Sequence, residues 1–91
     1  MIEQEKYLPL GTVVRLKTGI KPIMITGRRQ RTIDNPKEYD YIACLYPEGH
    51  IAPDKNILFN HEDIDEILFM GFESELEEIF ANTMLKAAID E

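Results

Sequence analysis

The chain has 91 residues, of which 44 % are hydrophobic, and it carries a formal net charge of −7. This length predicts one domain, residues 1–91, with a single compact core. It contains no run of about 18 apolar residues, and its first residues lack the apolar stretch of a signal peptide, so we expect neither a transmembrane helix nor a signal peptide. The lone cysteine, Cys44, excludes an internal disulfide, indicates a reducing cytoplasm and is expected to be a small buried hydrophobe.

The charge is unevenly distributed along the chain. Residues 1–60 carry nine basic and seven acidic groups, a net charge of +2, whereas residues 61–91 carry one basic and ten acidic groups, a net charge of −9. Such an acidic segment repels nucleic acid and anionic lipid, because both are polyanions. We therefore expect no nucleic-acid partner and no membrane insertion. The acidic segment either keeps the protein soluble or meets a basic partner.

The first half of the chain begins with a predicted flexible polar leader, residues 1–7. Two short apolar runs follow, residues 12–16 and residues 23–26, with a turn-rich link between them. They predict a β-hairpin, and Gly27 is expected to close the second strand at a bulge.

The pattern of apolar residues selects a register for this hairpin. If residues 18–21 form the loop, Leu16 faces Ile23 and Val14 faces Ile25, so that the four side chains make one apolar patch. A two-residue loop would instead place Leu16 opposite a lysine. The longer loop is therefore the prediction.

The middle of the chain predicts a loop and a central strand. Residues 28–39 contain three Arg and the turn signal Asp34-Asn35-Pro36, so they are expected to form a loop. Residues 39–46 are rich in aromatic and β-branched side chains and are apolar on both faces. They predict a third strand at the centre of the sheet.

Two further strands and a helix are predicted to complete the fold. Residues 56–60 and 64–70 read as strands, joined by a helical turn or tight connection. Residues 74–89 predict a C-terminal helix that begins at a capping box, in which Ser74 and Glu77 satisfy free amide groups. The fold class is α+β, a small bent five-stranded antiparallel sheet or SH3-like barrel with a C-terminal helix.

The predicted helix carries an apolar stripe that must be buried against something. We expect it to pack over an open end or face of the sheet. Docking to another protein, or formation of a homodimer, is the alternative. The stripe consists of Leu76, Ile79, Phe80, Thr83, Met84 and Ala87.

Enzymatic chemistry has little support in the sequence. Ser74 and Cys44 lack the context of a catalytic nucleophile. A hydrolase or metal enzyme could use His50, His61 and Asp63, but their spacing matches no recognised metal motif. We therefore expect no catalytic residue, no metal site and no cofactor.

Three polar turns or loops are the candidate surfaces for binding a protein partner. The first is the arginine-rich loop, because Arg is favoured at interfaces. The second follows the third strand, and the third precedes the fifth strand; function often lies on such connections. The candidate partner-binding residues are Arg28, Arg29, Arg31, Tyr46, Pro47, Glu48, His50, His61 and Asp63.

Several short motifs resemble a known bacterial family. They are Leu8-Pro9-Leu10-Gly11-Thr12-Val13-Val14, Met24-Ile25-Thr26-Gly27-Arg28, Tyr39-Asp40-Tyr41, Tyr46-Pro47-Glu48-Gly49 and Phe59-Asn60-His61-Glu62-Asp63-Ile64-Asp65. Together they resemble the small domain-of-unknown-function family numbered four-one-seven-six, found in Firmicutes, over roughly residues 7–80. The chain departs from the family pattern at Arg15, where the pattern is usually apolar.

The resemblance implies a cellular context. Proteins of this family look like accessory components encoded with LXG-type toxins and the type VII secretion machinery. The resemblance therefore implies a cytoplasmic accessory factor, targeting factor or chaperone, with a secreted toxin or its targeting factors as partner. An immunity protein that blocks a cognate toxin domain is the alternative, in which the acidic C-terminal third would mimic an anionic substrate.

Overall fold

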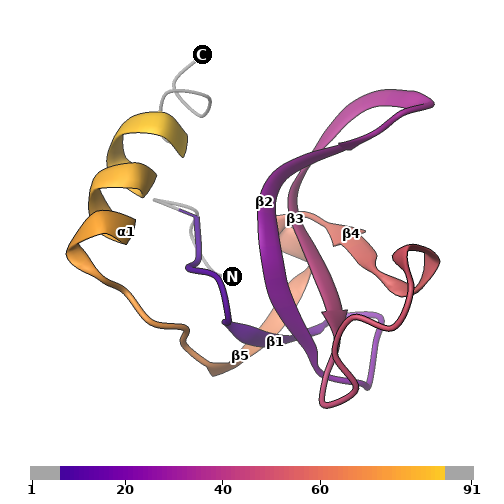
Figure 1. The fold of residues 1–91 in the computed structure, drawn as a ribbon. Helices are drawn as coiled ribbons and strands as arrows, with labels where there is room; N and C mark the ends of the chain where they lie inside the picture. Colours follow the sequence, from indigo (N-terminus) through magenta and orange to yellow (C-terminus); the bar gives the residue numbers. More distant parts are fainter. Residues whose placement is uncertain (1–6, 86–91) are drawn as a thin grey trace.

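The computed structural model describes residues 7–85, apart from the side chains of Asn35, Met84 and Leu85. The described chain is α+β, as predicted, with a five-stranded antiparallel sheet in the order β4-β3-β2-β1-β5 (Figure 1). The sheet is open, with β4 and β5 at its edges. The strands are β1 (Val13–Leu16), β2 (Ile23–Thr32), β3 (Asn35–Leu45), β4 (Ile57–Phe59) and β5 (Ile64–Phe69).

The predicted register of the first hairpin is wrong by two residues. Val14 pairs with Ile23 rather than with Ile25. The pairing of β1 with β2 ends at Val14 and Ile23, so Leu16 is not paired with the lysine that argued against this register. On its other side, Leu16 pairs with Ile64 of β5. Because side chains alternate with a period of two, a two-residue shift leaves Val14, Ile23 and Ile25 on the core face.

The predicted loop over residues 28–39 is instead the far half of a long hairpin. Strands β2 and β3 stay paired as far as Thr32 and Asn35, which leaves a two-residue turn. Opposite charges help to hold this extension, because Arg31 lies directly across from Glu38. Figure 1 shows this part of the hairpin projecting beyond the other strands.

Other sequence predictions for the sheet are confirmed. The register of β2 against β3 shifts between Ile25 and Gly27, which is the expected bulge. Strand β3 is central, lying between β2 and β4, and Cys44 is buried. The helical turn before β5 is a 3-10 helix, η2 (His61–Asp63), and a second one, η1 (Pro53–Lys55), precedes β4.

The core lies on one face of the sheet and includes a residue that the sequence had placed in the leader. Tyr7 is buried, and its ring packs edge-on against Tyr41 with 5.9 Å between the ring centroids. The amide of Leu8 donates a hydrogen bond to the Tyr41 hydroxyl at 3.0 Å. The buried cluster comprises Tyr7, Leu8, Val14, Ile23, Ile25, Tyr41, Ala43, Phe59, Ile64 and Ala81.

The C-terminal helix begins where it was predicted. Helix α1 (Glu75–Phe80) is followed by a π-helical turn, η3 (Ala81–Leu85), and the rest of the predicted helix lies outside the described residues. The Ser74 hydroxyl accepts a hydrogen bond from the Glu77 amide at 3.0 Å, which is one half of the predicted capping box.

Candidate protein-binding surface

An ion pair joins α1 to strand β2. The Arg28 guanidinium donates two hydrogen bonds to the Glu77 carboxylate, at 2.6 and 2.9 Å. Both side chains are largely buried, with 6 % and 15 % exposed. Such a two-point contact fixes the orientation of the two side chains as well as the distance between them. It therefore holds one particular face of α1 towards the sheet.

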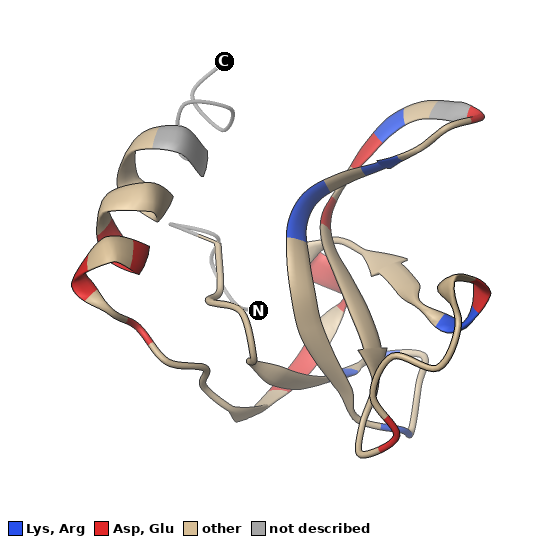
Figure 2. Cartoon of the chain, in the orientation of Figure 1, with Lys and Arg blue, Asp and Glu red and all other residues tan. Residues whose placement is uncertain are grey.

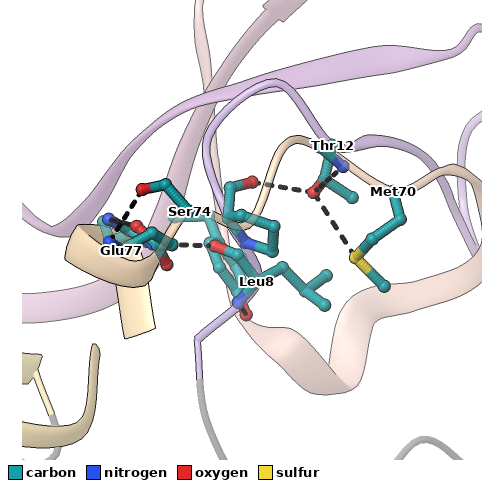
Figure 3. Close-up of polar contacts among 9 residues, drawn as sticks. Leu8, Thr12, Met70, Ser74 and Glu77 are labelled. Atoms are coloured by element: carbon teal, nitrogen blue, oxygen red, sulfur yellow. Dashed lines mark hydrogen bonds and ion pairs between the residues drawn. The ribbon is translucent and has the colours of Figure 1, made fainter. Parts of the chain in front are cut away.

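The same arginine connects the helix to the N-terminal segment. Its Nη1 atom also donates to the backbone carbonyl of Leu8 at 3.2 Å, and its guanidinium lies 5.5 Å from the ring centre of Phe80. In Figure 3, Leu8, Ser74 and Glu77 lie together at this junction. Arg28 therefore joins β2, the N-terminal segment and α1.

A second polar contact holds the chain between β5 and α1. The Gly71 amide donates to the Thr12 hydroxyl at 3.0 Å, and that hydroxyl donates to the carbonyl of Pro9 at 2.7 Å (Figure 3). A Cβ atom on Gly71 would collide with the carbonyl oxygen of Leu10 and would lie 2.9 Å from the Thr12 nitrogen. Only glycine permits this close approach of the two backbones.

These contacts leave the large apolar side chains of α1 facing solvent. Ser74, Glu77 and Ala81 share one side of the helix by their spacing, and Ala81 is only 3 % exposed. Leu76 and Ile79, on the other side, are 78 % and 54 % exposed. The expectation that the stripe packs on the sheet is therefore wrong for these two residues, because the Arg28–Glu77 pair turns the opposite face inward.

Further large apolar side chains are exposed at the end of β5 and in the segment that follows. We call the large apolar side chains exposed along this segment and α1 the apolar surface: Leu68, Phe69, Met70, Phe72, Leu76, Ile79 and Phe80. Exposed apolar residues that gather into a patch mark protein-interaction sites on soluble proteins. The sequence showed the helical part of this surface as a stripe, but not that it would remain uncovered.

An apolar groove adjoins the end of β5. It has a volume of about 360 Å³ and includes Leu68 and Phe69 from the apolar surface together with Tyr46, which the sequence had proposed as a contact residue. The complete lining is Gly11, Val13, Pro22, Met24, Tyr46, Leu68 and Phe69. The groove is large enough to accept apolar side chains from a partner.

The other two predicted arginines lie on the projecting hairpin. Arg29 and Arg31 both contact the Glu38 carboxylate, at 3.1 and 3.3 Å. The hydrogen bond from Arg29, assisted by the charges of both arginines, lowers the pKa of Glu38. These arginines thus have a partner within the hairpin, while Arg31 remains well exposed.

The predicted contact loop after β3 lies at the opposite end of β2. The amide of Tyr46 donates to the carbonyl of Pro22 at 3.0 Å. The hydrogen bond from Lys21 lowers the pKa of Glu48, and the two charges are 2.9 Å apart. His50 is exposed and lies 3.1 Å from the Asn56 amide, and Pro47 is also exposed.

The remaining two predicted residues have structural contacts. His61 is buried, and its Nδ1 atom lies 2.9 Å from the Tyr41 hydroxyl. This hydroxyl also accepts a hydrogen bond from the Leu8 amide, so Tyr41 links His61 to the N-terminal segment. Burial lowers the pKa of His61, with a smaller opposing effect from Asp40. The Asp63 carboxylate caps η2 by accepting from the Asn60 amide at 2.8 Å.

The nine predicted residues therefore occupy separate parts of the molecule. Arg28 and His61 are used in internal contacts, while the others divide between the two ends of β2 and the η2 turn. Within residues 7–85, His, Cys, Asp and Glu side chains do not gather in groups of three or more that could hold a metal ion.

The charges on α1 differ from those on the hairpin. Figure 2 shows acidic residues at the start of α1 and on β5, and both basic and acidic residues along the β2–β3 hairpin. Glu75 and Glu78 are exposed on α1 beside the apolar stripe. The apolar surface therefore has an acidic border on its helical part.

One family comparison produced a match. Residues 7–80 match the sequence model of a family described as Domain of unknown function (DUF4176). The chain belongs to this family. The DUF4176 description assigns no catalytic activity, and no curated protein and no solved structure matched the chain. In the described part of this DUF4176 protein, no helix has the length and apolar character needed to span a membrane.

Proposed function

We propose that this DUF4176 protein is a non-enzymatic protein-binding module, acting in the cytoplasm as an accessory factor, targeting factor or chaperone for an LXG-type effector of type VII secretion. The apolar surface carries the binding part of the proposal. Its large side chains are exposed although the same chain buries comparable side chains in the sheet. The family resemblance supplies the secretion part, since such proteins look like components encoded beside LXG toxins.

The chemistry of the described residues supports binding rather than catalysis. His61 is buried against Tyr41, and Asp63 caps a helical turn, so the residues considered for an enzyme already have structural partners. His50 lies against Asn56. A general acid or base must reach its substrate and must have a pKa near the working pH. These contacts therefore support a binding role rather than a catalytic one.

Co-purification tests the proposal directly. The chain and the N-terminal region of the effector encoded beside it would be co-expressed, with the affinity tag placed on each partner in turn. We expect the two proteins to elute together in both arrangements. The absence of a complex with every protein encoded at the locus would remove the proposal.

The exposed acidic residues of α1 favour a second candidate function, that of an immunity protein. Exposed carboxylates such as Glu75 and Glu78 could mimic an anionic substrate in the toxin domain. An immunity protein would bind the isolated toxin domain and protect cells that express it. An accessory factor would bind the N-terminal region and give no protection.

A further inference from the structure

The apolar face of α1 has a defined chemistry that indicates what covers it. Leu76 and Ile79 lie at helical spacing and are both exposed, whereas Phe80 is partly exposed and lies beside Arg28. The buried pair between Arg28 and Glu77 holds the opposite face towards the sheet. The helix therefore cannot rotate to bury its own stripe without breaking a two-point contact between largely buried charges.

The charges beside this stripe discriminate among possible partners. Glu75 and Glu78 are exposed next to it, and α1 and η3 contain no Lys or Arg within residues 75–85. Packing the same face of a second copy around a two-fold axis would bring these carboxylates together, because a two-fold interface places each patch against itself. Anionic lipid is disfavoured for the same electrostatic reason.

We propose that the apolar face of α1 binds an amphipathic helix of another protein, whose apolar stripe is flanked by Lys or Arg. Helix ridges at this spacing fit the grooves of a second helix. Basic flanks would pair with Glu75 and Glu78, while Leu76 and Ile79 would be removed from water. This proposal names the partner chemistry at the surface on which the proposed function rests.

Two designed peptides provide the test. They share one apolar stripe and differ only in their flanks, which are Lys in one peptide and Glu in the other. Binding to the full chain would be measured by calorimetry at low and at moderate salt. We expect the Lys peptide to bind, with affinity that falls as salt rises, and the Glu peptide to bind much more weakly. Equal binding of the two peptides, or no binding of either, would overturn the proposal.

Variants of the protein locate the site. Leu76→Asp should weaken binding of the Lys peptide by about tenfold or more. The complex removes this side chain from water, and burying a charge there costs more than burying a leucine. The double variant Glu75→Lys/Glu78→Lys should reverse the preference in favour of the Glu peptide. Matched controls are Ile33→Asp and Asp54→Lys, which change exposed residues far from α1 and should leave binding unchanged.

The outcomes separate this inference from the proposed function. If the effector binds but Leu76→Asp and the charge reversal have no effect, the helix is not the site and this inference fails alone. If no locus protein binds while the peptide preference holds, the proposed function fails alone. A concentration-dependent dimer that Leu76→Asp abolishes, or binding to anionic vesicles in preference to the Lys peptide, would also overturn the inference.

Discussion

The sheet buries Val14, Ile25 and Tyr41 completely, whereas α1 leaves Leu76 and Ile79 more than half exposed. The difference lies in how each region is held. The sheet is stabilised by apolar burial, which is roughly proportional to the area removed from water. The helix is positioned by polar contacts, chiefly Arg28 with Glu77 and Thr12 with Gly71. This arrangement places the helix while leaving its apolar face available for a partner.

The largest contrast should appear when one side chain is truncated in each region. Ile25→Ala should lower the free energy of unfolding by about 2–5 kcal/mol, because it opens a cavity in the core. Leu76→Ala should change it by no more than about 0.5 kcal/mol, because that side chain is already exposed. Urea unfolding measures both values, and equal losses would contradict the proposed division between the two regions.

The connection to the helix should be sensitive to a single methyl group. Gly71→Ala should cost about 1–3 kcal/mol, since the new Cβ atom meets backbone rather than a flexible side chain. The control is Gly19→Ala, where the nearest atom is the Leu16 Cβ at 4.0 Å. Thermal unfolding of the two variants provides the comparison, and similar melting temperatures would argue against the close approach.

The ion pair on α1 should be more strongly coupled than the exposed pair on the hairpin. A double-mutant cycle on Arg28 and Glu77 should give a coupling of about 0.5–3 kcal/mol. The same cycle on Arg31 and Glu38, which are more exposed, should give a smaller coupling energy of about 0.2–1 kcal/mol.

Hydrogen exchange adds a positional readout to this comparison. Arg28→Ala should reduce protection of the α1 amides while leaving the amides of β3 protected. Loss of protection in both elements to the same extent would mean that the pair stabilises the whole domain rather than the position of the helix.

The smallest expected effect is a pH dependence from His61. Its pKa in the folded protein is lowered by burial, whereas in the unfolded chain it should be about 6.5. Between these two pKa values the unfolded state binds more protons than the folded state. The free energy of unfolding should therefore decrease as the pH falls from about 6.5 to the pKa of His61 in the folded protein. His61→Asn should reduce this slope in urea titrations, and the exposed control His50→Asn should retain it.

The local sequence pattern predicted much of the fold because neighbouring residues decide it. Alternation placed Val14, Ile23 and Ile25 on one face, and the Ser74 cap located the start of the helix. The loop predicted from the three arginines failed because cross-strand pairing of Arg31 with Glu38 outweighs a local preference for a loop. Tyr7 joined the core through Tyr41, a residue distant in sequence and invisible to a local pattern.

The sequence by itself determined the family, the α+β class, the core side chains of the first hairpin and the amphipathic character of the last helix. Only the tertiary structure decided which face of that helix turns inward. That choice depends on Arg28 reaching Glu77, across 49 positions of the chain, and on Gly71 lying against the Leu10–Thr12 backbone. Periodicity identifies an apolar stripe, but the contact that orients it joins residues whose proximity exists only in the folded chain.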